Sequence, residues 1–493
     1  MSETSPAASP SLEHVYDVAT RARLTEVEAE LARLSPSVRL RDPRALALRG
    51  VHASLSGDAA GGIALLKRSI SLASERERRY YIDLVVPLLI MVGSVDEAEV
   101  LLSAEPSERD ALSPALDAQR ALIQARRGLD ASSRELAESA LAAAREEEQP
   151  MIIARVLHRV AMVAFYREEF GEAQQRAVEA ARAYERIGAF RNAATSYSLL
   201  YVIAHGWLDD PEIARLYAER MTMSAERSGD LSLQNMGLVC QLGVAAELAD
   251  ERRFGSLRAR LLASPMPEQF RERYAYVVAE SLVHMWSGRF ESARASLTSL
   301  SEDPQRSLPE RSMCEALLAL CDAARGDATS AKRRAHLTLS RTGHRSAPEP
   351  LHERQIRRVA RVVAACTCIL LGENVRGRRA LSRAFDPQRI FSSFAASKLL
   401  DERVVPAAMR GYARAINAAR EANVRHTPPL GLTPAELQIL RLLPDGSTLD
   451  QIARSFGRSR KTIARHVGSI YGKLEVSNRT QAVQRARELG LDA

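Results

Sequence analysis

The chain has 493 residues, which excludes one ordinary domain and leads us to expect roughly two to four. Hydrophobic residues make up 46% and charged residues 26%, a balance typical of a soluble globular protein with ample core material. The net charge of +8 is uneven, because residues 376–493 hold 21 Lys and Arg against 10 Asp and Glu, which leaves the preceding residues at −3. A basic C-terminal quarter predicts a polyanionic partner at that end.

Residues 1–11 are polar, so we expect a disordered N-terminus. They also lack the run of basic and then apolar residues that marks a secretory signal. The longest apolar stretch, residues 85–92, is too short to cross a bilayer and contains Pro87. We therefore expect a cytoplasmic protein that has no membrane partner.

Residues 12–423 have apolar residues at three- and four-residue spacing, which predicts helix after helix and no strand. One unit recurs here: an apolar helix, a tight turn with Gly and a polar residue, and a second helix with a small residue at a fixed offset. The clearest turns are Gly57-Asp58, Gly93-Ser94, Gly288-Arg289, Gly326-Asp327 and Gly372-Glu373. Ala98, Ala293 and Ala331 stand five residues after three of these glycines, and a copy without the glycine runs through Glu169.

This unit resembles the tetratricopeptide repeat, a pair of helices of about 34 residues in which small residues allow close packing. The first two turns are 36 residues apart, and later neighbours are 38 and 46 apart. Most of the aromatic signature positions of the repeat are not matched. The resemblance implies an α-helical repeat array that serves as a sensor or interaction domain, and an irregular all-helical bundle is the alternative.

Five cysteines in a chain of this length do not form a disulfide framework. Cys366 and Cys368 form a C-x-C pair, while Cys314 and Cys321 lie on one face of a predicted helix. No second Cys or His cluster in the sequence completes a metal site. We predict buried, reduced thiols and no bound metal, with metal or redox sensing as the alternative.

Residues 424–431 contain two prolines and a glycine, which interrupt the helical periodicity and predict an interdomain linker. For residues 432–493 we then predict four short helices, because capping residues indicate where they begin. Thr433 and Thr448 each precede a Glu or Gln by three residues, the spacing of a capping box. Ser459 is placed to cap the third helix, and the fourth begins near Asn478.

The third helix, residues 460–474, is the informative one. Ile463, Val467, Ile470 and Leu474 fall on one face and predict the side turned to the core. No acidic residue lies between Asp450 and Glu475. The same interval holds six basic residues, which are Arg454, Arg458, Arg460, Lys461, Arg465 and Lys473. A helix with one apolar face and one basic face of small residues suits the major groove of DNA.

A series of residues in register supports this interpretation. In chain order they are Leu432, Thr433, Pro434, Glu436, Ile452, Ala453, Arg454, Thr462, Ile463, His466, Val467, Lys473, Leu474, Val476, Arg479, Thr480, Ala482 and Val483. With this pattern, residues 431–491 resemble the LuxR-type helix-turn-helix family. The resemblance implies a four-helix domain whose third helix reads DNA and whose fourth helix, residues 478–489, commonly forms the dimer contact.

The resemblance also assigns roles by position. Lys461, Thr462, His466 and Lys473 match backbone-phosphate contacts, and Ala464, Arg465 and Gly468 match positions turned to base edges. The chain departs from the family at 464 and 468, where longer polar or basic side chains are common, so Arg465 is the main candidate for base recognition. The remaining predicted DNA-binding residues are Arg458, Ser459, Arg460 and Ser469.

The sequence contains no G-x-x-x-x-G-K-[ST] loop, no alternating strands of a receiver domain and no readable catalytic motif. We therefore expect a protein without catalytic residues or cofactor, and not an enzyme. The prediction is an all-α, nucleoid-associated transcriptional regulator that binds double-stranded DNA as a homodimer, gated by a repeat domain that binds a protein, peptide or small molecule. RNA polymerase is a further candidate partner. The alternative is a helical-repeat scaffold or adaptor that binds DNA weakly or non-specifically.

Overall fold

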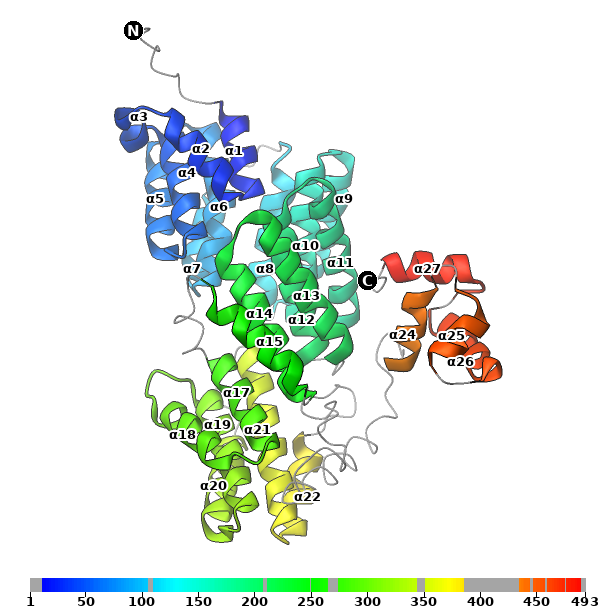
Figure 1. Ribbon diagram of the computed structural model, residues 1–493. Helices are drawn as coiled ribbons and strands as arrows, with labels where there is room; N and C mark the ends of the chain where they lie inside the picture. The colour runs from blue at the N-terminus through cyan, green and yellow to red at the C-terminus, as the bar shows by residue number, and fades with distance from the viewer. Residues whose placement is uncertain are drawn as a thin grey trace. The chain divides into compact units, whose positions relative to one another are not determined.

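The computed structural model describes residues 11–488 except 105–109, 207–210, 249, 265–273, 344–350, 385–433, 444–446, 457–458 and 475. Every regular element in these residues is an α-helix, which confirms the predicted all-α class (Figure 1). The predicted linker, residues 424–431, lies outside the described residues. No described helix is both long enough and apolar enough to span a membrane.

The chain divides into two compact units. Unit 1 comprises residues 1–200 and 220–236, and unit 2 comprises residues 201–219 and 237–493. The helices that lie wholly in unit 1 are α1 (Leu12–Arg21), α2 (Leu24–Arg33), α3 (Pro36–Arg41), α4 (Pro43–Leu55), α5 (Ala59–Leu72), α6 (Glu75–Met91), α7 (Val95–Ser103), α8 (Ser113–Arg126), α9 (Asp130–Glu146), α10 (Pro150–Tyr166) and α11 (Phe170–Arg186).

Three helices contribute residues to both units: α12 (Phe190–Gly206), α13 (Pro211–Ser228) and α14 (Leu231–Glu247). The remaining helices of unit 2 are α15 (Glu251–Leu262), α17 (Tyr274–Trp286), α18 (Phe290–Glu302), α19 (Leu308–Ala324), α20 (Ala328–Arg341), α21 (Leu351–Leu370), α22 (Asn374–Ala384), α24 (Pro434–Leu442), α25 (Leu449–Ser455), α26 (Arg460–Lys473) and α27 (Arg479–Glu488).

The five predicted glycine turns each join the two helices of a pair, and all five glycines have a positive φ, between +74° and +94°. In each turn the N–H after the glycine donates to the carbonyl five residues earlier, as Asp58 does to Ala53 at 2.9 Å and Glu373 to Cys368 at 2.8 Å. This bond closes the helix end and satisfies a carbonyl that the helix leaves unpaired. The copy without glycine has Glu168 in the same left-handed conformation, at φ 65°. The copies of the repeat therefore share the same left-handed turn conformation between their two helices.

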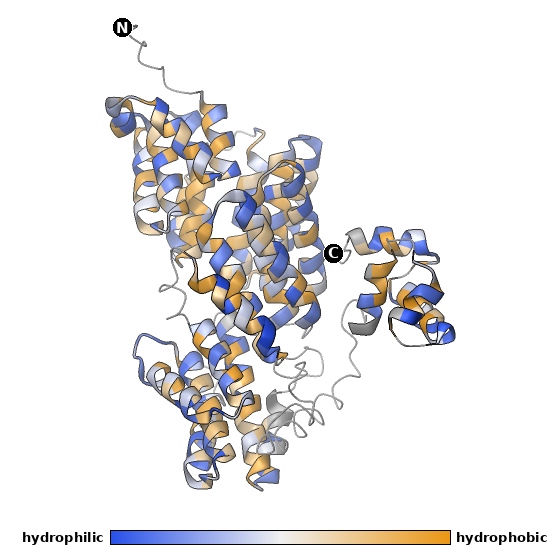
Figure 2. Ribbon diagram, viewed as in Figure 1, coloured by the Kyte–Doolittle hydropathy of each residue, from blue (hydrophilic) through white to orange (hydrophobic). Residues whose placement is uncertain are grey.

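The small residues that follow the turns pack as the sequence predicts. Ala98, Ala293 and Ala331 are fully buried, as is Ala173 in the copy without glycine. Because an alanine methyl is short, it lets the backbones of neighbouring helices approach closely. Figure 2 shows apolar residues gathered on the helix sides that face other helices. The helical-repeat prediction is confirmed on this geometry.

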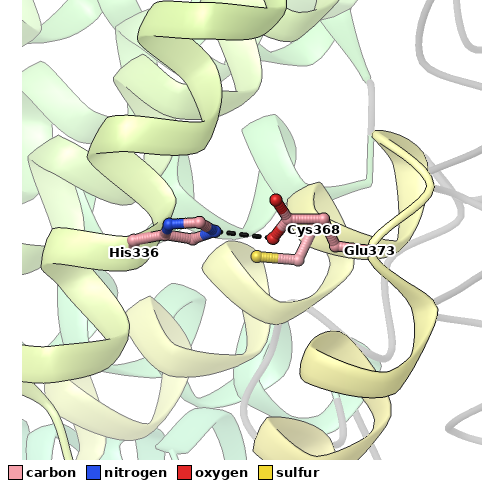
Figure 3. Close-up of side chains that lie close together, drawn as sticks. All are labelled: His336, Cys368 and Glu373. Atoms are coloured by element: carbon pink, nitrogen blue, oxygen red, sulfur yellow. Dashed lines mark hydrogen bonds and ion pairs between the residues drawn. The ribbon is translucent and has the colours of Figure 1, made fainter.

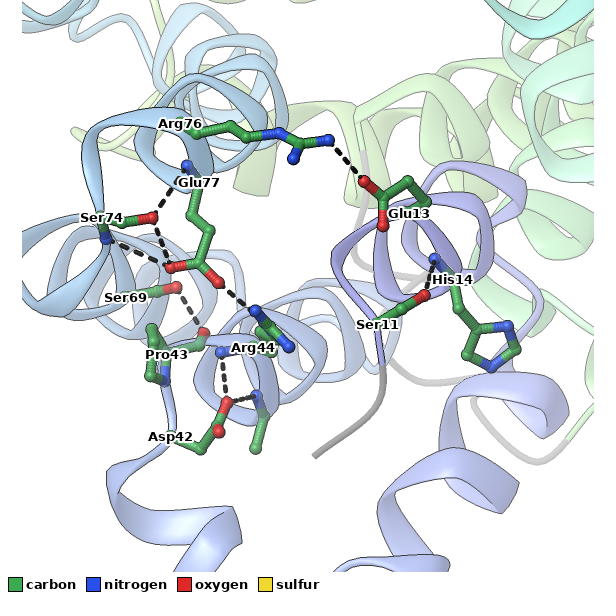
Figure 4. A network of polar contacts seen from close by, with 11 residues as sticks. Ser11, Glu13, His14, Asp42, Pro43, Arg44, Ser69, Ser74, Arg76 and Glu77 are labelled. Carbon is green, nitrogen blue, oxygen red and sulfur yellow. Dashed lines mark hydrogen bonds and ion pairs between the residues drawn. The ribbon is translucent and has the colours of Figure 1, made fainter. Parts of the chain in front are cut away.

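Polar contacts tie the first helices of unit 1 together (Figure 4). Arg44 on α4 donates to Glu77 on α6 at 2.7 Å, and Arg76 on α6 donates to Glu13 on α1 at 2.7 Å. Burial of Glu77 acts against ionisation, but the hydrogen bonds from Arg44 and Ser74 lower the pKa of its carboxyl below its ordinary value.

One boundary needs a correction. Ser11, which the sequence assigned to a disordered N-terminus, caps α1, because its hydroxyl accepts from the His14 N–H at 3.2 Å. Ser is a favoured helix cap, so Ser11 belongs to the helical region, whereas residues 1–10 lie outside the described residues.

All five cysteines are free, and four of them are buried as predicted. Cys314, Cys321, Cys366 and Cys368 are buried, and Cys240 is half-buried. Burial raises the pKa of the Cys314 and Cys321 thiols to about 12. Such thiols are protonated at neutral pH and are poor nucleophiles.

Candidate nucleic-acid interface

Helices α24 to α27 enclose a small apolar core of their own. Its buried residues are Ile439, Leu440, Leu443, Ile452, Ala453, Ile463, Val467, Ile470, Leu474, Ala482 and Ala486. The four apolar residues predicted to face the core from the third helix are all among them. The predicted helix over residues 460–474 is observed as α26, Arg460–Lys473.

Local capping fixes where the two central helices begin. Thr448 and Gln451 form the predicted capping box at the start of α25. The Ser459 hydroxyl accepts from the Thr462 N–H at 3.1 Å at the start of α26. A cap of this kind satisfies one of the free N–H groups of the first helical turn. Thr433, predicted to cap the first helix, lies outside the described residues.

The surface of α26 divides as the sequence predicts. The exposed residues are Ser459, Arg460, Lys461, Ala464, Arg465, Gly468 and Gly472, and those of intermediate exposure are Thr462, His466, Ser469, Tyr471 and Lys473. Together they form a ridge without a carboxylate, since none lies between Asp450 and Glu475. Arg458, the remaining predicted site residue, lies outside the described residues.

The N-terminal turn of α26 concentrates positive charge. Arg460 and Lys461 stand beside unpaired backbone N–H groups and the positive end of the helix dipole, an arrangement that favours phosphate. Asp450 lies 3.6 Å from Arg460, but both side chains are more than half exposed, at 70% and 56%. An exposed pair of this kind is weak and screened by salt, so Arg460 stays available to an anion.

Lys473 has a structural partner that sequence reasoning missed. Its ammonium donates to Glu436 on α24 at 2.6 Å, and the Glu436 side chain is only 4% exposed. From the sequence, Glu436 is expected only as the partner of Thr433 in a capping box, and Lys473 as a phosphate contact. In the structure the pair ties the end of α26 to α24, and the phosphate role of Lys473 stays a prediction.

Arg479 also acts within the domain. Its guanidinium donates to the carbonyls of Leu443 and Ser447, the latter at 2.9 Å. These carbonyls flank the connection from α24 to α25, so Arg479 anchors the start of α27 there. Its place in the motif was the only sequence signal, because the carbonyls it reaches are more than thirty residues away.

Comparison with known proteins addresses the same segment. The GerE family, described as bacterial regulatory proteins of the luxR family, matches residues 430–486. These residues are a LuxR-family domain. Over 60 residues the chain is 43% identical to the probable transcriptional regulatory protein SgaR of Hyphomicrobium methylovorum. The aligned segment covers 12% of this chain and 28% of SgaR. Over 108 residues it is 28% identical to the transcriptional regulatory protein DesR of Bacillus subtilis. This aligned segment covers 18% of this chain and 54% of DesR. The chain therefore spans about half or less of these relatives.

A solved structure resembles a larger part of the chain. It is a signal transduction ATPase with a tetratricopeptide repeat sensor from Pyrococcus horikoshii. The match covers 74% of this chain and 52% of that one, at 11% identity and a TM-score of 0.39. A score this low carries no argument, so the repeat architecture rests on the turns and packing described above.

One cluster has the donor types of a metal site (Figure 3). Donor atoms of His336 on α20, Cys368 on α21 and Glu373 lie within 4.8 Å of one another, and nitrogen, sulfur and oxygen are all zinc ligands. The sequence missed this cluster because α20 and α21 bring His336 to the C-x-C pair only in the folded chain. However, Arg376 donates to Glu373 at 3.3 Å and also contacts His336. A guanidinium thus already supplies the positive charge here, and the expectation that no metal is bound stays a prediction.

Proposed function

We propose that this chain is a sequence-specific transcriptional regulator that places α26 in the major groove of double-stranded DNA. The observation that carries the proposal is the carboxylate-free ridge of α26, with its capped N-terminus and apolar opposite face. A helix that only faces solvent is expected to carry acidic as well as basic side chains on its exposed face, whereas α26 carries no acidic side chain. The LuxR-family match over residues 430–486 supports the same conclusion.

Within this proposal the residues of the ridge have different tasks. Lys461, Thr462 and His466 contact phosphates, which fixes the register of the helix on the duplex. Arg465 reaches a base edge, because it is the exposed long side chain near the middle of α26. Ala464 and Gly468, which are short, leave room for the groove floor.

We extend the proposal to a homodimer through α27 and to control by the repeat region. Val483 on α27 is only half-buried within its own domain, which leaves apolar surface for a second copy. More than four hundred residues precede the DNA-binding domain, and helical-repeat arrays commonly bind partners along their concave surface. We propose that the repeat region gates DNA binding, and that the chain performs no catalysis of its own.

In vitro selection from a random DNA library by the full chain tests the first part. Recovery of one preferred sequence supports a specific regulator. Salt-sensitive binding without any preferred sequence supports the scaffold alternative and rejects our proposal.

The gating proposal needs a separate measurement on the selected DNA. Its affinity for the full chain is compared with that of residues 426–493 fused to a dimeric coiled coil. Masking by the repeat region requires tighter binding by the fused fragment. Equal affinities would leave the repeat region without a gating role.

A further inference from the structure

Unit 1 contains a cavity of about 230 Å³ whose walls are of two kinds. Part of the lining is apolar and includes Val51 and Leu55, which belong to the core formed by α1, α2 and α4. The other part is polar and includes Gln119, Arg155, His158 and Arg159. A partly enclosed space with apolar walls and a few convergent polar groups is typical of a small-molecule site.

Three of these polar residues, Gln119, Arg155 and Arg159, contact one carboxylate, that of Asp83 on α6, which is fully buried. Arg155 and Arg159 on α10 both pair with it, at 2.5 and 3.1 Å. Gln119 on α8 donates to Asp83 at 2.5 Å, as does the hydroxyl of Tyr16 on α1. Four helices therefore meet at this group.

The charges around Asp83 do not balance. Two guanidinium groups, each only 7% exposed, share one carboxylate. His158 adds no charge at neutral pH, because burial and the neighbouring Arg159 lower its pKa to about 4. Arg191, a further lining residue, has its own partner in Asp230 at 2.9 Å. One positive charge in the wall is left without a counter-ion, which is costly in a buried site.

We propose that this cavity binds a small monocarboxylic acid with an apolar body. The carboxylate lies against Arg159 and Arg155, and the body lies against the apolar wall. One surplus charge matches a monoanion better than a doubly charged phosphate, and the forked guanidinium fits a carboxylate. The small volume of the cavity, about 230 Å³, excludes a long extended peptide.

The site has a direct structural consequence. Its lining residues come from successive helices of unit 1, among them α1, α4, α6, α8 and α10, so a bound acid would bridge successive repeats and stabilise unit 1. The role of the acid as an effector of DNA binding rests on the proposed function. The binding of the acid to the chain does not depend on that function.

Calorimetric titration of the full chain tests the site with straight-chain acids from butanoate to decanoate. Each acid has a matched control in the 1-alkanol of equal length. We expect saturable binding of at least one acid and at least ten-fold weaker binding of its alcohol. Equal binding of acid and alcohol, or no binding of any acid, overturns the proposal without any variant.

Arg159→Met removes the surplus charge and leaves Asp83 paired with Arg155, so it is expected to fold. It should weaken binding of the acid at least ten-fold. Arg145→Met, which changes a half-exposed arginine outside the cavity, should leave binding unchanged. Unchanged binding in Arg159→Met rejects the site.

DNA affinity, measured with and without the acid in the same samples, separates the two proposals. A bound acid that leaves DNA affinity unchanged keeps the site and removes its effector role. If no acid binds the unaltered full chain while its DNA binding is intact, the site is rejected and the proposed function in DNA binding stands.

Discussion

Two groups of arginines in this chain carry the same charge in opposite surroundings. Arg155 and Arg159 are buried in unit 1 and held by Asp83, whereas Arg460 and Arg465 are exposed on α26. Buried charge is stable only where each partner is in place, so geometry decides what the first group can bind. Exposed charge costs little and is free to meet phosphate. The same side chain thus suits a selective pocket in one region and a broad polyanion contact in the other.

The largest effect should come from the shared carboxylate. Asp83→Ala leaves two buried guanidinium groups without a counter-ion, and we expect a loss of about 3–5 kcal/mol in the free energy of unfolding. Urea unfolding followed by circular dichroism measures it. Asp17→Ala, which removes a half-exposed partner of Arg21, should change stability by less than about 0.5 kcal/mol. Similar losses in the two variants would mean that the buried network does not stabilise unit 1.

The second prediction concerns pH and the histidine beside this network. The pKa of His158 is about 4 in the folded chain, because burial and then Arg159 disfavour its charged form, against about 6.5 in the unfolded chain. The unfolded chain therefore binds more protons between these values, and stability present above pH 6.5 is lost as the pH falls towards 4. The full difference is roughly 3 kcal/mol.

His158→Gln should remove that part of the pH dependence. Urea midpoints of both proteins at several pH values between 4 and 7 provide the comparison. Parallel pH curves for the two proteins would contradict a buried, neutral His158.

On the exposed side, Arg465→Ala should relax preference at one base position and cost roughly 1–3 kcal/mol there. Lys461→Ala should instead weaken binding to all sequences about equally and lower the salt dependence. Affinities for the selected DNA and for single-base variants, each at two salt concentrations, distinguish them. If Arg465→Ala weakens every sequence equally, it contacts phosphate and not a base.

The smallest effect concerns the glycines of α26. A Cβ at Gly468 or Gly472 would meet no other atom of the chain within 4 Å, so alanine should stabilise the helix by about 1 kcal/mol at either position. If the DNA backbone approaches Gly468 closely, Gly468→Ala also weakens DNA binding. Gly472→Ala, nearer the helix end, serves as the matched control in melting and binding assays. Unchanged affinity in both variants would mean that neither glycine is needed for close approach.

The sequence by itself determined the features that depend on near neighbours along the chain. The glycine turns, the caps at Thr448 and Ser459 and the two faces of α26 all follow from residues three to six positions apart. Such interactions form within one helix or turn, so their signal survives in the linear pattern. Both the helical-repeat class and the position of the carboxylate-free ridge on α26 could therefore be predicted.

Only the tertiary structure decided which distant polar groups meet. Asp83 and Arg155 stand on different helices, as do Glu436 and Lys473 or His336 and Cys368. No periodicity marks such pairs, because their encounter depends on how the helices pack and not on spacing along the chain. Burial then sets their energies, and it converts an ordinary scatter of charged residues into a pocket with one unpaired positive charge.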